Sequence, residues 1–245
     1  MIARLREINP LTALAAAVLL VIVAYVVPAP LGPLAGLGVA VLLAAMTGVA
    51  RRVTFLAAAV AIPTWLFLVV MNALVAPQGD VLRVAGVEIA PGALLPAAWI
   101  SLRLGAAVAA LGWVVMTTPP QRLVRALAQR GLPAWSQYLL AASLAAVPEA
   151  RRRAREVLDA QRCRGLAVGG GPLARLRATL PLAGPLMVSL VTEAERRALA
   201  LDARAFDSRA ARTSLTEIAD PSAERALRTA MWGVTVALIV WGLVR

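Results

Sequence analysis

The sequence predicts an all-α protein that crosses a membrane several times. It is 60% hydrophobic with a mean hydropathy of +0.78, and only 16% of its residues are charged, against about 25% in soluble domains. Ala, Leu and Val supply most of the apolar content while aromatic residues make up 4%, which favours helices over strands. The alternating segments of about ten residues that mark a transmembrane barrel are not evident.

Uncharged apolar runs predict about five transmembrane helices, because a bilayer core requires about twenty apolar residues in a helix. A polar loop at 77–91 separates the third run from the fourth. The basic flank before the first run has no convincing cleavage site after it, so we expect a retained helix rather than a cleaved signal. The runs are residues 11–27, 34–50, 53–75 and 92–116 in a region 1–117, and 230–244 in a C-terminal region 229–245.

Clusters of arginine predict the orientation. They lie before the first run, between the second and third, and after the fourth, so all fall on one side of the membrane. The positive-inside rule assigns that side to the cytosol, with the N-terminus there, for a multi-pass protein of the cell (inner or plasma) membrane. The clusters are Arg4 with Arg6, Arg51 with Arg52, and Arg122 with Arg125 and Arg130.

The region 118–228 differs from the rest and is predicted to form a cytosolic or interfacial layer of helices. A short amphipathic helix carries the arginines after the fourth run. Two long helices follow, at about 134–164 and 172–205, separated by Gly165 and the glycine-rich stretch before Pro172. The apolar part of the first, 134–147, is too short to span a bilayer, and spanning would place the arginines after it outside the cell.

Composition also limits the chemistry. The net charge is +12, and every basic residue is arginine. Beside apolar spans, this excess indicates the cytosolic face of a membrane protein rather than a nucleic-acid-binding protein. With no His, no Lys and one Cys, a disulfide within the chain, a Cys/His metal site and a lysine phosphate loop are not expected. The apolar runs carry no acidic residue for proton or cation coupling. We therefore expect no catalytic residue, bound metal or cofactor.

Two arginine triplets are the candidate functional residues. Cys163-Arg164-Gly165 and Ala203-Arg204-Ala205 each end one of the long helices. A cation at a helix C-terminus gains about 0.3–1 kcal/mol from the macrodipole, which explains a single arginine there. Two similar triplets with small flanking residues also fit partner docking, where a desolvated arginine contributes about 2–4 kcal/mol.

Arg103 is a charge inside the fourth apolar run. Intramembrane charges are costly and are often functional. Its aliphatic stem also allows the guanidinium to reach the outer interface. A structural or partner contact inside the membrane and an interfacial position both remain open for this residue.

These features together resemble the transmembrane T component of energy-coupling factor (ECF) transporters. Asn9-Pro10-Leu11-Thr12 resembles the Pro-x-Thr entry to the first span, and Ser101-Leu102-Arg103-Leu104 resembles the arginine-bearing span. The stretch 117–133 resembles the short helix that follows. The triplets resemble the two Ala-Arg-Gly signatures, with Cys163 and Ala205 as departures at the flanking positions.

The resemblance implies a non-catalytic subunit of an ATP-driven vitamin or metal-ion importer. The long helices would be crossing coupling helices, and Arg164 and Arg204 would each dock on one of two cytosolic ABC-type ATPase subunits, which bind the ATP and Mg²⁺. A small membrane S component would bind the substrate and rotate in the lipid to release it. The sequence does not identify the substrate, so biotin, thiamine precursors, riboflavin, cobalt and nickel stay open.

Two other classes of function remain open from the residues alone. The chain could be a stand-alone membrane carrier or enzyme, although Arg103 and Asn72 are its only intramembrane candidates for such work. It could also be a membrane anchor that recruits acidic proteins or anionic lipid through its arginines.

Overall fold

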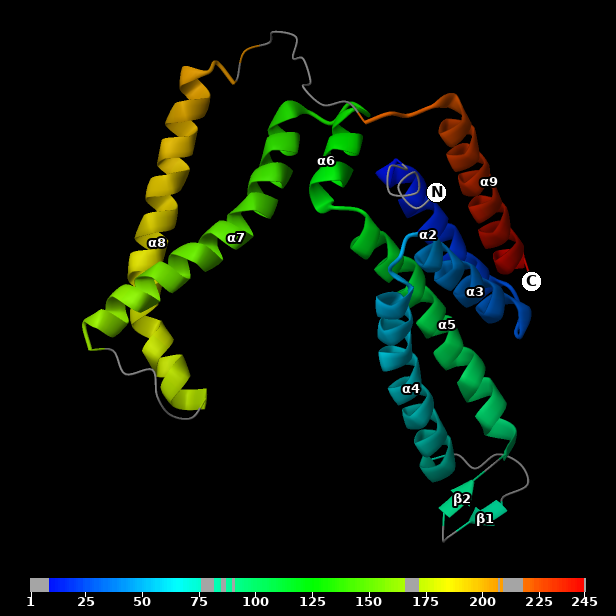
Figure 1. Cartoon of the computed structure of the whole chain (residues 1–245). Coiled ribbons are helices and arrows are strands. Elements are labelled where there is room, and N and C mark those ends of the chain that lie inside the picture. Colours follow the sequence, from blue (N-terminus) through cyan, green and yellow to red (C-terminus); the bar gives the residue numbers. More distant parts are fainter. Residues whose placement is uncertain are drawn as a thin grey trace. The chain divides into compact units, whose positions relative to one another are not determined.

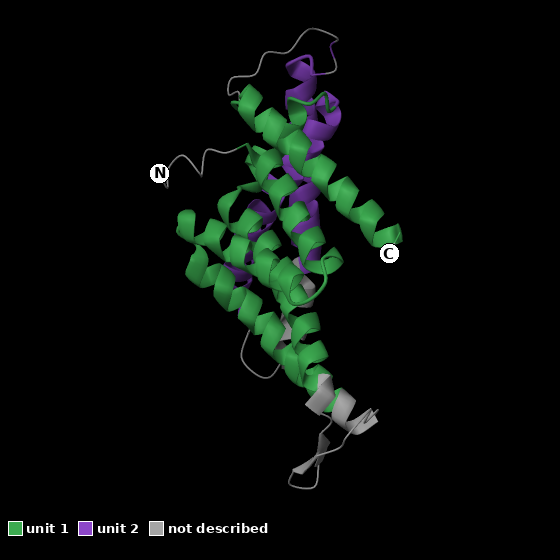
Figure 2. Ribbon diagram, turned by 90° about the vertical axis from the view of Figure 1, so that its right-hand side faces the viewer, with its two compact units in different colours: residues 1–132, 218–245 green, residues 133–217 purple. Residues whose placement is uncertain are grey.

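The computed structural model describes residues 9–75, 82–84, 87–89, 91–165, 172–206, 208 and 218–244. These residues form eight helices and one short hairpin (Figure 1). The chain divides into two compact units (Figure 2), which are described separately below. Unit 1 comprises residues 1–132 and 218–245, and unit 2 comprises residues 133–217.

Unit 1 is a helical bundle organised around two central helices. Helix α5 lies against α2, α3 and α4, and α2 also contacts α6 and α9. The predicted helices at 11–27, 53–75 and 92–116 are confirmed with nearly the expected ends. The helices of this unit are α2 (Pro10–Val26), α3 (Leu31–Met46), α4 (Ala50–Val75), α5 (Pro91–Thr117), α6 (Pro120–Ala128) and α9 (Ser222–Val244).

The core of unit 1 is built mainly from small side chains. A Cβ added at Gly36 of α3 would lie 2.9 Å from the Cβ of Ala24 on α2, so these backbones pack closely. Small residues permit such close approach between helices in a membrane. Trp113 of α5 is the large exception, and its buried Nε1 donates a hydrogen bond to Thr47 Oγ1 over 3.2 Å. Ala17, Ala24, Ala40, Ala44, Ala109 and Ala110 are all fully buried.

The lengths of the apolar helices make the chain a polytopic membrane protein. Among the described residues, Ala50–Met71, Leu94–Thr117 and Ser222–Val244 are long and apolar enough to cross a membrane. Helices α2 and α3 are apolar but shorter, at 17 and 16 residues, or about 25 Å each. Large apolar side chains such as Phe55 and Leu243 point outward, as lipid-facing residues do.

The predicted polar loop between α4 and α5 contains a small hairpin. Strands β1 (Leu82–Val84) and β2 (Val87–Ile89) pair antiparallel, with Arg83 opposite Glu88. A pair of three-residue strands gives almost no periodicity in the sequence, which explains why only a loop was predicted.

Helix α9 begins earlier than the sequence predicted, at Ser222 rather than near Ala230. Its first turns carry charged residues that the hydropathy pattern assigns to a polar segment. One of them, Arg228, is 6% exposed and is bound by neighbouring polar groups rather than by solvent. Internal partners therefore allow the helix to extend through this polar stretch.

Unit 2 consists mainly of two long helices that contact and cross each other (Figure 1). Helix α7 (Ala134–Cys163) has 30 residues, about 45 Å, and helix α8 (Pro172–Ala203) has 32. Both long helices were predicted from the sequence and are confirmed. Neither is among the candidate membrane spans found in the described residues, in agreement with the rejection of 134–147 as a span.

Candidate functional site: two arginine-bearing helix ends

The first candidate arginine ends helix α7. Arg164 is the C-cap residue, with φ −88° and ψ 9°, and its N–H donates to the carbonyl of Gln161 over 3.1 Å. Gly165 follows with φ +93°, a left-handed conformation that glycine adopts without steric cost, and its N–H donates to the carbonyl of Arg162 over 3.0 Å. Cys163, Arg164 and Gly165 are all exposed.

The second candidate arginine ends helix α8 with the same backbone geometry. Ala205, the residue after Arg204, has φ +52°, and its N–H donates to the carbonyl of Asp202 over 2.9 Å. The N–H of Phe206 donates to the carbonyl of Leu201 over 3.0 Å, which completes a Schellman motif. Ala203, Arg204 and Ala205 are exposed.

The two triplets therefore present equivalent side chains. Each arginine sits at the cap of a long helix, and the residue after it reverses the chain. In the described part of the chain, neither the Arg164 nor the Arg204 guanidinium has a hydrogen-bond or ion-pair partner. Both are exposed cations at the negative ends of helix dipoles, a position that suits binding of an acidic group.

An aromatic contact fixes the end of α8 to the beginning of α7. The rings of Phe206 and Tyr138 meet edge to face, with centroids 5.3 Å apart and an interplanar angle of 60°. This arrangement is the favourable one for aromatic pairs and contributes about 0.5–1.5 kcal/mol beyond area burial. The position of Arg204 is thus tied to the first turns of the other helix.

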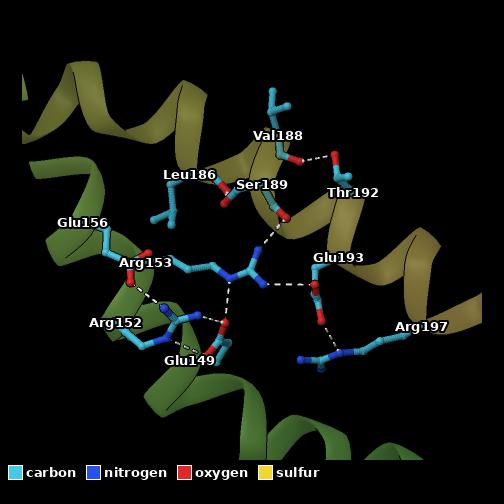
Figure 3. Close-up of polar contacts among 10 residues, drawn as sticks. All are labelled: Glu149, Arg152, Arg153, Glu156, Leu186, Val188, Ser189, Thr192, Glu193 and Arg197. Atoms are coloured by element: carbon cyan, nitrogen blue, oxygen red, sulfur yellow. Dashed lines mark hydrogen bonds and ion pairs between the residues drawn. The ribbon is translucent and has the colours of Figure 1, made fainter. Parts of the chain in front are cut away.

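An ion-pair network joins α7 and α8 where they cross (Figure 3). Arg153 of α7 donates through Nη2 to Glu193 Oε2 of α8 over 3.0 Å, and through Nη1 to the carbonyl of Ser189 over 3.0 Å. Its Nε donates to Glu149 Oε1 over 2.8 Å on its own helix. Arg197 Nε donates to Glu193 Oε1 over 2.9 Å, an i, i+4 pair within α8.

The arginines in this network keep its carboxylates ionised. Arg152, followed by Arg153, lowers the pKa of Glu149 to about 2. Arg153, followed by Arg197, lowers the pKa of Glu193 below its ordinary value. Both acids are therefore charged throughout the physiological pH range, and the link between the helices does not change with protonation there.

Arg103 lies within the membrane-spanning part of α5, as predicted, and is partly buried. Its Nε is buried and has no hydrogen-bond partner among the described residues. Arg103 belongs to unit 1, whereas the two triplets belong to unit 2.

Several polar residues of consequence were not predicted from the sequence. Arg153 reads as one of several arginines on a solvated face, and its contact with Glu193 depends on how the helices cross. Asp220 and Arg228 lie between the second long helix and the last apolar run, where the sequence predicts no helix or strand. No local spacing in the sequence marks the contact between Asp220 and Arg228, which are eight residues apart.

Comparison with known proteins identifies the family. The family model CbiQ, described as cobalt transport protein, matches residues 3–215. The chain belongs to this family. The match covers all of the helices except α9, and it includes both arginine triplets.

Curated relatives of the chain carry the name Energy-coupling factor transporter transmembrane protein EcfT. The protein from Thermanaerovibrio acidaminovorans is 31% identical over 162 residues, which cover 62% of this chain and 60% of the relative. The Heliobacterium modesticaldum protein is 27% identical over 192 residues, 73% and 72% of the two chains. The Bacillus subtilis protein is 26% identical over 163 residues, 62% of each. For the first and third of these, the chain spans less than two thirds of the relative's length.

These matches confirm the resemblance to the T component. The chain is thus a transmembrane member of the CbiQ family, and the relatives it matches are named as transmembrane proteins of energy-coupling factor transporters.

Proposed function

We propose that this protein is the coupling subunit of an ATP-driven ECF importer. Two cytosolic ATPase subunits bind at the ends of α7 and α8, one through Arg164 and one through Arg204. A separate membrane S component selects and carries the substrate, a vitamin or a metal ion. The observation that carries the proposal is the pair of equivalent helix ends, each presenting an exposed arginine without a partner in the described chain.

The proposed membrane arrangement has five transmembrane helices, with α2 and α3 crossing together with α4, α5 and α9. The arginine clusters support a cytosolic N-terminus. Helices α2 and α3 are short for an average bilayer, and local thinning or tilting of their neighbours accommodates such a mismatch at modest cost.

Unit 2 transmits the work of the ATPases in this proposal. ATP binding draws the two subunits together, and the arginines move the attached helix ends. The ion pairs at the crossing couple the helices to each other, because Arg153 holds Glu193 from the opposite helix. Exposed apolar side chains of unit 2, including Leu139 and Met187, offer a surface for the S component and lipid.

The test is removal of both docking cations. We expect Arg164→Ala with Arg204→Ala to abolish co-purification of the ATPase subunits, because each arginine contributes about 2–4 kcal/mol as an interface hot spot. Each single variant retains partial binding, since the second site still tethers the complex. Arg151→Ala, on the exposed face of α7, is the matched control.

Unchanged ATPase binding in the double variant would contradict the docking role. A graded loss that follows the number of arginines removed, with Arg151→Ala as harmful as Arg164→Ala, would instead support a non-specific basic anchor. High salt would then release the bound proteins in proportion.

A further inference from the structure

A polar cluster in unit 1 gathers residues from both ends of the sequence. It joins the start of α2, the end of α6 and the start of α9. Three of its members are nearly inaccessible to solvent: Asn9 is 2% exposed, Thr12 is 5% and Arg228 is 6%. The cluster consists of Asn9, Thr12, Arg130, Asp220, Glu224, Arg225 and Arg228.

Asp220 is the centre of this cluster. Arg228 donates to both of its carboxylate oxygens, over 3.0 Å to Oδ2 and 3.3 Å to Oδ1. Arg130 Nη2 donates to Oδ2 from the other side over 2.9 Å. The same two cations, Arg228 before Arg130, lower the pKa of Asp220, so the carboxylate stays charged. We call these three residues the Asp220 clamp.

The remaining members anchor the clamp to the membrane bundle. Thr12 Oγ1 accepts a hydrogen bond from Arg228 Nη1 over 3.3 Å and donates to Glu224 Oε2 over 3.5 Å. The backbone N–H of Asn9 donates to the same Glu224 oxygen over 3.0 Å. The beginnings of α2 and α9 are therefore held together, and Arg228, which is buried, has two partners for its charge.

The clamp residues lie next to the two segments of chain that join unit 1 to unit 2. Arg130 stands immediately before residues 131–133, through which the chain passes from unit 1 to α7. Asp220 stands shortly after the segment that returns the chain from α8 to unit 1. Each of the two connecting segments therefore has a residue of the Asp220 ion pair at its unit 1 end: Arg130 for the first segment and Asp220 for the second.

We propose that the Asp220 clamp fixes both connections to a single point of the membrane bundle and thereby transmits movement of α7 and α8 to it. Without the Arg130 contact, residues 131–133 can move relative to the membrane bundle, so that movement of α7 is not passed on to the bundle. The transmission step rests on the proposed coupling function, whereas the fixing of the connections does not. Arg130 and Asp220 are positioning residues and do not bind the ATPases.

Arg130 is the member to change, because it can be altered without unfolding the protein. Its side chain is 48% exposed and an exposed ion pair of this kind contributes little to stability. Asp220 and Arg228 are unsuitable for this test. Removing Asp220 leaves the buried Arg228 charge without its ion-pair partner, and truncating Arg228 removes a buried side chain that also contacts Thr12. Arg130→Glu places a like charge against Asp220, Arg130→Lys preserves the attraction, and Arg125→Glu makes the same charge change on exposed α6 surface.

The first experiment uses the full chain in lipid nanodiscs, with Cys163→Ala to remove the native thiol. Spin labels at Gln129 and Ala226, both exposed, report the distance across the clamp. We expect Arg130→Glu to widen the distance distribution at least twofold, while Arg130→Lys and Arg125→Glu match the parent. An unchanged distribution in Arg130→Glu would overturn the proposal.

The second experiment uses the complex with its ATPase subunits and labels at Arg151 and Thr229. We expect ATP to shift this distance in the parent and in Arg130→Lys. In Arg130→Glu the shift should fall at least threefold although ATPase binding and ATP hydrolysis persist. An undiminished shift would overturn the transmission step. If the parent binds no ATPase, the proposed function fails, and with it the transmission step, while the first experiment still decides whether the clamp holds.

Discussion

The ends of α7 and α8 share a backbone geometry but reach it with different residues. At the end of α7 the left-handed position is Gly165, for which φ +93° carries no steric cost. At the end of α8 it is Ala205, whose Cβ makes φ +52° unfavourable by about 1–2 kcal/mol. The contact of Phe206 with Tyr138 is available to offset this cost. The left-handed turn that exposes the arginine is thus intrinsically allowed by Gly165 at the end of α7, whereas at the end of α8 it depends on the packing of Phe206.

The largest expected effect comes from exchanging the two turn residues, which tests whether the helix ends differ in backbone strain. We expect Gly165→Ala to destabilise the last turn of α7 by about 1–2 kcal/mol, because no neighbouring atom obstructs a Cβ there and only the backbone conformation is penalised. Ala205→Gly should stabilise the end of α8 by up to about 1 kcal/mol, since part of the gain is lost to greater freedom of the unfolded chain. Hydrogen exchange of the amides in each last turn measures both effects.

Gly184→Ala in α8 is the matched control for these substitutions. It adds the same methyl group in open space within a helix, where alanine is favoured by about 1 kcal/mol. If Gly165→Ala were as harmless as Gly184→Ala, the left-handed turn would not be needed to present Arg164.

Removing the aromatic contact should weaken the α8 end alone. We expect Phe206→Leu to cost about 0.5–1.5 kcal/mol there, because leucine keeps apolar bulk but loses the edge-to-face pair. Tyr138→Phe retains both rings and should have little effect. Hydrogen exchange near Arg204 should rise while exchange near Arg164 stays constant, and an equal rise at both ends would contradict the difference between them.

The smallest expected effect concerns pH, to which both ends should respond alike. The pKa of Glu149 is about 2, below its ordinary value, so its contribution is complete above about pH 4.5 and is lost as the pH falls through the folded value. Glu149 holds Arg153, which in turn binds Glu193 of α8, so we expect the α7–α8 crossing to be constant from pH 5 to 8 and to loosen only as the pH falls toward about 2. Spin labels on the two helices measure this, and loosening near pH 6 would contradict the assignment.

Local signals in the sequence predicted the α7 end well. Gly165 after a charged helical run marks a C-terminus, and the observed cap lies at Arg164. The i, i+4 spacing of Glu193 and Arg197 is a local signal of the same kind, and the structure pairs them. Such features depend on neighbours within a few residues, which the sequence displays directly.

Features that depend on tertiary contacts could not be predicted. Alanine is not a residue that signals a turn, so the sequence does not predict the left-handed conformation of Ala205. The contact of Phe206 with Tyr138 explains how this conformation is maintained. The early start of α9 contradicts its local polarity until Asn9 and Thr12, from the far end of the chain, supply partners for its charges. The docking role of Arg164 and Arg204 stays a prediction from the resemblance.

Cys163 provides a native labelling site at the candidate docking end of α7. It is the only thiol in the sequence, it is exposed, and it is adjacent to Arg164. A maleimide dye can therefore be attached beside one candidate docking point without any substitution. The α8 end, which has no such handle, serves as the unlabelled reference within the same molecule.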